Sequence, residues 1–342
     1  MSLKLGAGFL RATRFVKRRR LLRATAAIHR AVDAYLGRRP RRFRPTEPAA
    51  QVRGRFVSGS YTNHFGTREY KVYIPALYHG QALPLIVMLH GCKQNPEDFA
   101  AGTRMNALAD ERGFLVVYPR QPSKANASHC WNWFEPQHQQ RERGEPSLIA
   151  GITREVVGTY QLAEDRVFVA GLSAGGAMAA IMATTYPDLY AAVGIHSGLA
   201  YAAAYDVSSA FAVMRGDEFR RSGTEPPAAV RLVPTIVFHG DRDSTVHPAN
   251  GDRVIAQVSN EHGGSDDSHL AVEHGAANGR AYTRTIRRDI DGGVLTEHWL
   301  VHGASHAWSG GSAAGSYADA EGPDASREML RFFLERPEPR IT

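Results

Sequence analysis

The chain has 342 residues, is 43% hydrophobic and carries a formal net charge of +7. This length allows one large or two small domains, and the composition supports a sizeable core. The apolar runs fall short of the roughly 18 residues of a transmembrane helix, so we expect no such helix.

The positive charge is concentrated in residues 1–45. They hold 14 of the 41 Lys and Arg residues and a single acid, Asp33, so the rest of the chain is net negative. Apolar residues recur between these basic residues at roughly helical spacing, and Gly37 and Pro40 end the pattern. The pattern predicts a basic amphipathic helix, or two such helices.

Three interpretations of this basic segment are open. It is a helix docked on the following domain or partly disordered, an anchor (residues 1–44) on an anionic or apolar surface, or a nucleic-acid contact. Nucleic acid is disfavoured because tight basic clustering is confined to residues 17–20. The segment differs from a secretory signal peptide, which favours a cytoplasmic protein and leaves an extracellular one as the alternative.

A second domain is expected over residues 46–337, after an Arg- and Pro-rich linker. Its apolar strands alternate with helices, which predicts an α/β fold with a mainly parallel central sheet and helices on both faces. The predicted strands are a hairpin over 55–74, then 85–90, 114–118, 166–171, 191–196, 234–239, 280–288 and 294–302. The predicted helices are 98–112, 147–161, 174–186, 249–259 and 323–335.

Three less regular segments separate these elements. Residues 121–147 are expected to form a loop over the functional site, and residues 201–227 a helix and a flap. Residues 261–279 are expected to be an exposed loop. The histidines of this last segment lack metal-ligand spacing, so no metal site is expected at His262, His269 and His274.

The most informative motif is Gly-x-Ser-x-Gly at residues 171–175. It follows an apolar strand and precedes a helix rich in Ala and Met. A serine on a tight strand-to-helix turn has an exposed hydroxyl, and the helix N-terminus favours developing negative charge. The sequence therefore predicts Ser173 as a nucleophile and the N–H group of Ala174 as one donor to an oxyanion.

A serine nucleophile needs a general base and an acid that orients this base. One apolar strand leads into a loop with Asp243, and a later strand leads into a loop with His306. These two residues are the predicted acid and base because loops beyond strand ends can bring them to the serine. The alternatives are Asp241 for the acid, and His302 and His298 for the base.

A second oxyanion donor is expected after an early strand. Residues 85–89 (LIVML) are continuously apolar and are followed by His90, Gly91 and Cys92. The N–H group of Cys92 is the predicted donor, since a loop at this place supplies one in enzymes with a serine on such a turn. Two tryptophans near these motifs are predicted to form a wall for the substrate, namely Trp131 and Trp308.

Several motifs together carry a family resemblance. They are residues 89–94 (LHGCKQ), 109–121 (ADERGFLVVYPRQ), 130–134 (CWNWF), 143–145 (RGE) and 171–178 (GLSAGGAM). This combination resembles the poly(3-hydroxybutyrate) depolymerase family of esterases, which is similar to the feruloyl and acetylxylan esterases of carbohydrate esterase family 1. The resemblance implies an α/β-hydrolase fold, ester substrates, no cofactor, and a triad of Ser173, Asp243 and His306.

The resemblance extends to the substrate and the cysteines. Poly(3-hydroxybutyrate) or its oligomers are the expected substrate, and feruloyl or acetyl esters of plant polysaccharides are the alternative. An insoluble polymer granule would make residues 1–44 useful as a surface anchor. Cys92 and Cys130 are the only cysteines, and both lie in the motifs beside the expected site. We expect them to form a disulfide, which favours an oxidising compartment.

Overall fold

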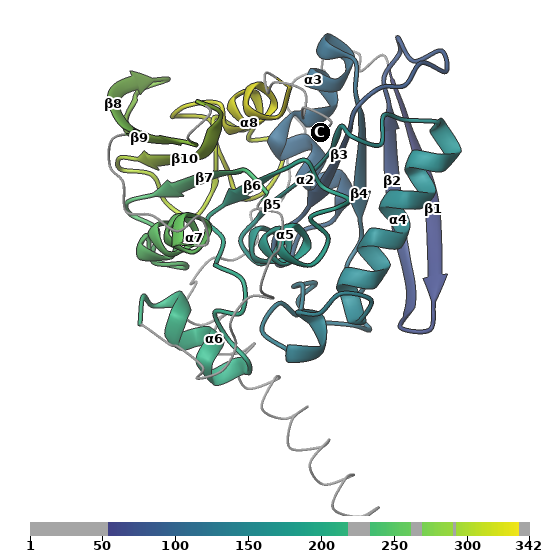
Figure 1. The fold of residues 1–342 in the computed structure, drawn as a ribbon, viewed down its shortest axis with the longest axis horizontal. Helices are drawn as coiled ribbons and strands as arrows, with labels where there is room; N and C mark the ends of the chain where they lie inside the picture. Colours follow the sequence, from purple (N-terminus) through teal and green to yellow (C-terminus); the bar gives the residue numbers. More distant parts are fainter. Residues whose placement is uncertain (1–53, 218–232, 261–268, 290–291, 335–342) are drawn as a thin grey trace, which may run out of the picture. The chain divides into compact units, whose positions relative to one another are not determined.

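A ten-stranded sheet forms the centre of the protein (Figure 1). The structure is a computed structural model that describes residues 54–217, 233–260, 269–289 and 292–334. The strands are β1 (Arg55–Asn63), β2 (Gly66–Ile74), β3 (Leu85–Leu89), β4 (Leu115–Pro119), β5 (Val167–Leu172), β6 (Ala192–His196), β7 (Thr235–Gly240), β8 (Leu270–Ala277), β9 (Arg280–Arg288) and β10 (Val294–Val301). Their order across the sheet is β1-β2-β4-β3-β5-β6-β7-β10-β9-β8.

The middle of the sheet is parallel and its two ends are antiparallel. The run β4-β3-β5-β6-β7-β10 pairs in parallel, and β1, β2, β9 and β8 add antiparallel pairs at the edges. Parallel strands present their carboxyl ends at one edge, where open α/β sheets bind ligands. The predicted α/β fold with a mainly parallel sheet is confirmed.

Helices cover both faces of the sheet. On one face, α4 (Gly144–Tyr160), α5 (Ala174–Thr185) and α7 (Ala249–Asn260) contact the strands. On the other face lie α2 (Pro96–Thr103), α3 (Met105–Arg112) and α8 (Ala325–Leu334). Shorter elements complete the fold, namely η1 (Pro136–His138), α6 (Val207–Met214), and a small sheet of β11 (Trp308–Ser309) and β12 (Ala318–Asp319).

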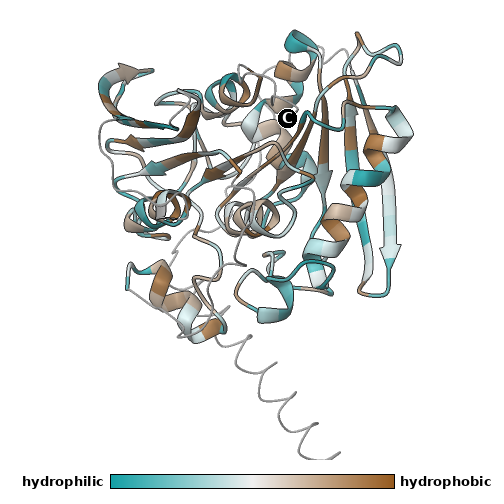
Figure 2. Ribbon diagram, in the orientation of Figure 1, coloured by the Kyte–Doolittle hydropathy of each residue, from teal (hydrophilic) through white to brown (hydrophobic). Residues whose placement is uncertain are grey.

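Two hydrophobic cores result from this layering. Strand β3 is buried along its whole length, and its side chains alternate between the two faces. Leu85, Val87 and Leu89 join the core under α4 and α5, whereas Ile86 and Met88 join the core under α2, α3 and α8. In Figure 2, brown apolar residues mark the central strands, and teal polar stretches lie on the outer helices and loops. A strand buried on both faces explains the continuous apolar runs in the sequence.

Two sequence predictions about these elements are wrong. The helix predicted over 98–112 is two helices, because Arg104 adopts a left-handed backbone conformation (φ 56°) and begins a new helix. The Arg104 side chain donates to the carbonyl oxygen of Gly310 and binds Asp324 across the fold. The loop predicted over 261–279 contains β8, an edge strand that pairs with β9. Most of its residues are exposed, and its sequence (LAVEHGAA) lacks a regular alternation of apolar and polar side chains, so it gave no strand signal.

Some predictions fall outside the described ranges. They concern the basic segment 1–45, His262 and residues 218–227 of the predicted helix and flap. Of the rest of that prediction the structure describes residues 201–217, which include α6. Within the described ranges, no group of three or more His, Cys, Asp or Glu residues is placed to hold a metal. None of the helices in these ranges is long and apolar enough to cross a membrane.

Candidate active site

Ser173 lies at the sharp turn between β5 and α5. Its backbone has φ 58° and ψ −121°, a strained conformation for a residue with a side chain. The flanking glycines make the turn possible, because a Cβ atom on Gly175 would collide with the carbonyl oxygen of Leu89, and one on Gly171 with that of Gly175. The turn leaves Ser173 partly exposed among buried neighbours, as the motif predicts for a reactive hydroxyl.

Two aspartate–histidine pairs form beyond the ends of β7 and β10. His306 Nδ1 lies 2.7 Å from Asp243 Oδ2, and His302 Nδ1 lies 3.1 Å from Asp241 Oδ2. The Asp243 side chain is fully buried and that of His306 is 10% exposed, whereas Asp241 and His302 are 31% and 39% exposed. The alternative acid and base thus pair with each other. The pair Asp243–His306 has the burial and the short contact that orient an imidazole.

Asp243 is held as a carboxylate by four donors. Its Oδ1 accepts the backbone N–H groups of Thr245 and Val246, each at 2.8 Å. Its Oδ2 faces His306, and His239 Nε2 lies 3.5 Å away. Burial alone raises the pKa of Asp243, but the charges and hydrogen bonds of His306 and His239 hold this pKa well below the ordinary value. The ionised carboxylate fixes the proton of His306 on Nδ1 and leaves Nε2 as the basic nitrogen.

His196, on β6, joins the serine to the histidine loop. Its carbonyl oxygen accepts the Ser173 N–H group at 2.9 Å, and its Nε2 accepts the Ser309 N–H group at 2.9 Å. Because Nε2 accepts, the ring carries its proton on Nδ1, which points at the Ser197 hydroxyl. His196 therefore fixes both the turn of Ser173 and the chain three residues after His306. Sequence analysis did not find this role, because a buried histidine at a strand end gives no signal.

The loop with the predicted oxyanion donor lies against Ser173. A Cβ atom on Gly91 would be 3.6 Å from the Cβ atom of Ser173. Gln94 Oε1 accepts the Gly91 N–H group at 2.9 Å, and Gln94 Nε2 donates to the Ser316 carbonyl oxygen at 2.9 Å. Gln94 thus ties this loop to the segment after His306. Of the two predicted donors, the N–H group of Cys92 belongs to this loop, and that of Ala174 belongs to the first residue of α5, next to the serine.

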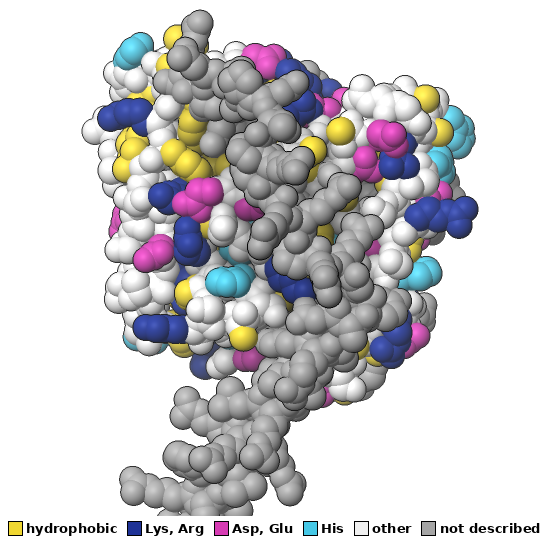
Figure 3. Space-filling model, turned by 180° about the vertical axis from the view of Figure 1, so that it is seen from behind, with side chains coloured by type: hydrophobic (Ala, Val, Ile, Leu, Met, Phe, Trp, Pro, Cys, Tyr) yellow, Lys and Arg dark blue, Asp and Glu magenta, His cyan; other side chains and the backbone are white. Residues whose placement is uncertain are grey.

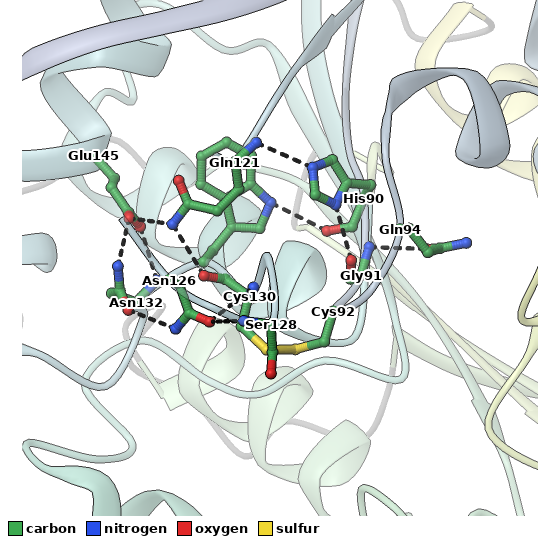
Figure 4. The surroundings of a disulfide bond; sticks show 11 residues. His90, Gly91, Cys92, Gln94, Gln121, Asn126, Ser128, Cys130, Asn132 and Glu145 are labelled. Atoms are coloured by element: carbon green, nitrogen blue, oxygen red, sulfur yellow. Dashed lines mark hydrogen bonds between the residues drawn. A yellow bond between two sulfur atoms is a disulfide. The ribbon is translucent and has the colours of Figure 1, made fainter. Parts of the chain in front are cut away.

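The disulfide Cys92–Cys130 joins this loop to the segment between β4 and α4 (Figure 4). The Lys93 N–H group also donates to the Ser128 carbonyl oxygen at 2.7 Å, beside the disulfide. The disulfide acts on Cys92, whose N–H group is the predicted oxyanion donor, and the hydrogen bond acts on the next residue, Lys93. The expected disulfide is therefore present in the structure.

A buried carboxylate holds the other side of this segment. Glu145 is fully buried at the start of α4. Its Oε2 accepts the Asn132 N–H group at 2.8 Å, and its Oε1 accepts Asn132 Nδ2 at 2.7 Å and Gln121 Nε2 (Figure 4). Arg68 Nη2 lies 3.5 Å from the same oxygen and supplies a positive charge. Sequence analysis found Glu145 only as part of a family motif, and the structure shows what it contacts.

Trp131 and Trp308 are buried, which contradicts the prediction that they wall the substrate site. Their exposed fractions are 0% and 1%. Trp131 Nε1 donates to the His90 carbonyl oxygen at 3.1 Å, and Trp308 Nε1 donates to the Ser326 hydroxyl at 3.0 Å. The Trp308 ring also stacks on His196. Both indoles are buried because their large apolar area is more stable in the core than beside solvent. From there they contact residues next to the site, namely His90 and His196.

Three buried histidines make the stability of the protein depend on pH. Burial lowers the pKa of His90 and of His298 to about 4, and that of His196 to about 3. The unfolded chain binds these protons with a pKa near 6.5, so stability is present above that pH and is lost as pH falls toward the folded-state values. We expect the free energy of unfolding to fall by on the order of 1–2 kcal/mol for each histidine between pH 7 and pH 5.

Urea denaturation at both pH values checks this prediction. His196→Gln, which can keep an acceptor for Ser309, should reduce the pH dependence of the free energy of unfolding. His274→Gln is the matched control, because His274 is exposed on β8 and should leave that dependence unchanged. A protein equally stable at pH 7 and pH 5 would contradict the prediction.

The disulfide is expected to stabilise the fold and the predicted oxyanion loop together. Its cysteines are 38 positions apart, so replacing both with Ser should lower the free energy of unfolding by about 3–4 kcal/mol. Any hydrolytic activity of the site should fall as well, because the N–H group at position 92 loses its tether. Urea denaturation and turnover, each with and without dithiothreitol, measure both effects. The double variant is its own control, since the reductant should not change it, and equal stability of oxidised and reduced wild type would contradict the prediction.

The chain is similar in sequence to a polyester depolymerase and to a feruloyl esterase. The chain is 31% identical over 238 residues to poly(3-hydroxyalkanoate) depolymerase C of Paucimonas lemoignei, a match that covers 65% of this chain and 54% of that enzyme. The chain thus spans about half the length of that relative. It is 28% identical to feruloyl esterase B of Neurospora crassa, with 73% of this chain and 82% of that enzyme covered.

A solved structure shows the fold. The acetyl xylan esterase from Aspergillus awamori superposes with a TM-score of 0.61 at 19% identity, and the match covers 81% of this chain and 98% of that one. The central sheet and its helices are therefore an α/β-hydrolase fold. A sequence model described as esterase PHB depolymerase matches residues 68–277, from β2 to the end of β8. This match covers more than half of the chain, and the protein belongs to the esterase PHB depolymerase family.

Proposed function

We propose that this protein is a serine esterase that hydrolyses polyester or oligoester bonds through an acyl-enzyme. The observation that carries the proposal is the buried pair Asp243–His306, held by its 2.7 Å contact. His196 supports it, because it binds both the strained Ser173 turn and the segment that follows His306. A hydroxyl on such a turn, an oriented imidazole and an ionised carboxylate are the three groups that acyl transfer needs.

The reaction has two steps. His306 Nε2 takes the proton of the Ser173 hydroxyl while the oxygen attacks the ester carbonyl carbon, and the alcohol leaves with that proton. A water molecule, deprotonated by His306, then attacks the acyl-enzyme and releases the acid. Asp243 stabilises the imidazolium in both steps, and the N–H groups of Cys92 and Ala174 stabilise the negative oxygen of each tetrahedral intermediate.

The proposed substrate is poly(3-hydroxybutyrate) or its oligomers. Two relatives that match over most of the domain are named for this chemistry, a poly(3-hydroxyalkanoate) depolymerase and a poly(3-hydroxybutyrate) depolymerase of Ralstonia pickettii. Feruloyl or acetyl esters of plant polysaccharides are the second candidate, since feruloyl esterases and acetylxylan esterases match comparable lengths of the chain. The proposed acyl-transfer machinery would act on esters of either class, so the two candidates differ only in the substrate.

We further propose that residues 1–44 anchor the enzyme on a polymer granule or an anionic surface. These residues are strongly basic, whereas many Arg side chains of the described ranges form ion pairs with acidic side chains. Figure 3 shows this mixture on one face, and Arg327 and Glu111 form one such pair at 2.8 Å. The proposed location is a granule in the cytoplasm, argued from the basic charge of residues 1–44, and the disulfide supports the extracellular alternative.

Release of soluble 3-hydroxybutyrate from amorphous polymer granules tests the proposed function. The full chain should release it, and Ser173→Ala should not. Cleavage of short soluble esters without release from granules would move the substrate to oligomers or carbohydrate esters. A protein that neither cleaves esters nor reacts at Ser173 with an organophosphonate would overturn the esterase proposal. Deletion of residues 1–44 should weaken granule association, and unchanged association would overturn the anchor.

A further inference from the structure

His239 lies at the end of β7, beneath the loop that carries Asp243. Its side chain is fully buried. Its Nε2 lies 2.8 Å from the Val246 carbonyl oxygen and 3.5 Å from Asp243 Oδ2. A carbonyl oxygen only accepts hydrogen bonds, so the ring carries its proton on Nε2. One N–H group therefore points at the turn of Asp243 from below.

This N–H group acts on the turn that holds the carboxylate. The N–H groups of Thr245 and Val246 donate to Asp243 Oδ1, and the carbonyl oxygen of Val246 accepts from His239. His239 thus fixes the far end of the turn. It also faces Oδ2, the oxygen that binds His306. Rotation of the carboxylate would break contacts on both of its oxygens.

The ring is fixed from behind by α7. A Cβ atom on Gly251 would lie 3.1 Å from His239 Nδ1 and 2.9 Å from His298 Nε2, so α7 packs directly on both rings. Within the described ranges, neither nitrogen has a hydrogen-bond partner. Among the described residues, His239 therefore makes its side-chain hydrogen bond through Nε2, to the Val246 carbonyl oxygen. The titratable groups that face it are Asp243, His196 on β6 and His298 on β10, and His298 in turn pairs with Asp252 on α7.

We propose that His239 is a positioning residue for Asp243, and through it for His306. It holds residues 243–246 in the conformation that aims Oδ2 at His306, and it shares the negative charge of the carboxylate. The inference rests on the proposed function of the Asp243–His306 pair. Its role differs from that of the triad, because His239 touches neither the substrate nor the reacting atoms.

Replacement of His239 by Leu and by Gln tests the proposal. Leu removes the donor, and Gln can keep an N–H group near the position of Nε2. We expect His239→Leu to lower kcat roughly tenfold, with KM changed less than about twofold, because transition-state orientation is lost rather than binding. His239→Gln should recover most of the activity. Equal activity of the Leu variant and wild type, or equal loss in both variants at full folding, would overturn the proposal.

The pH dependence of kcat/KM separates the positioning role from partial unfolding, because a smaller folded fraction lowers the activity at every pH without shifting the profile. In His239→Leu the Asp243 carboxylate has one donor fewer, so it attracts the positive charge of the protonated His306 ring more strongly. The acid limb of kcat/KM should therefore move to higher pH in His239→Leu, by roughly half to one unit, and stay near its wild-type position in His239→Gln. An unmoved limb in the Leu variant would contradict the shared charge.

A second pair of variants tests the contact between α7 and the Nδ1 edge of the His239 ring. Gly251→Ala adds a methyl group against both rings and should lower kcat in the same direction, roughly three- to tenfold. Gly158→Ala is the matched control on α4, because a Cβ atom there meets nothing within 4 Å. It should leave kcat and the pH profile unchanged. Full activity of Gly251→Ala would show that the position of the ring does not matter.

Proton NMR separates failure of this inference from failure of the proposed function. The His306 Nδ1 proton, hydrogen-bonded to Asp243, should give a downfield resonance in the unliganded enzyme, which weakens in His239→Leu and persists in His239→Gln. Loss of this resonance in a protein without esterase activity would support the positioning role and overturn the proposed function. An unchanged resonance in His239→Leu would overturn the positioning role, whatever the protein hydrolyses.

Discussion

Ser173→Ala is expected to lower kcat for ester hydrolysis by roughly three to six orders of magnitude. The variant lacks the oxygen that attacks the carbonyl carbon. A water molecule could attack in its place, but it would not be positioned as the serine hydroxyl is. The fold should persist, because the turn is held by backbone contacts, such as the Ser173 N–H group on the His196 carbonyl oxygen at 2.9 Å. Turnover of a short soluble ester and the circular dichroism spectrum measure the two halves of the prediction.

The control for this variant is a serine outside the site. Ser58→Ala changes an exposed residue of β1 and should leave turnover unchanged. An organophosphonate should label the wild type and Ser58→Ala with equal stoichiometry, and it should not label Ser173→Ala. If Ser173→Ala kept more than a tenth of the wild-type kcat, another nucleophile would perform the reaction.

Asp243→Asn is expected to lower kcat by about 10⁴-fold while KM changes little. The amide cannot stabilise the imidazolium, and its NH₂ group can donate to His306 Nδ1, which places the proton of the ring on Nε2. The base nitrogen is then blocked. The backbone donors Thr245 and Val246 can still bind the amide oxygen, so the turn should keep its shape. The measurement is kcat and KM on a soluble ester, with urea denaturation to confirm folding.

The second aspartate provides a matched control two positions away. Asp241→Asn weakens the contact with His302 and with the Gly303 N–H group, which Asp241 Oδ1 accepts at 2.7 Å. Both side chains of this pair are partly exposed, so we expect kcat to change less than about twofold and stability to fall slightly. A larger loss of kcat from Asp241→Asn than from Asp243→Asn would reverse the assignment of the acid.

Most of the fold could be predicted because its signals are local. Strands β3, β5 and β7 are short apolar runs, and burial on both faces requires this composition. Strand β8 escaped prediction for the opposite reason. It lies at the edge of the sheet, most of its residues are exposed, and its pairing with β9 depends on a distant part of the fold rather than on its own side chains. The break at Arg104 likewise depends on contacts with Gly310 and Asp324.

The supporting residues of the site carry no comparable signal. Gln94 binds Ser316 across 222 positions, and His196 binds Ser309 across 113. A buried glutamine or histidine has no periodicity that marks such a partner. Trp131 and Trp308 were predicted at a substrate wall from their nearness in sequence to Cys130 and His306. Their burial shows that nearness along the chain does not determine which way a large side chain points.

By itself, the sequence determined the α/β architecture, the Ser173 turn and a short choice of acids and bases, because strands, tight turns and their glycines depend on neighbouring residues. Only the tertiary structure determined which histidine Asp243 and Asp241 each contact, and these contacts are what favours Asp243 as the proposed acid. These residues are two positions apart, and what separates them is which histidine each one meets, His306 in a buried contact or His302 near the surface. Such a choice depends on distance and burial between strands far apart in sequence, which local composition does not encode.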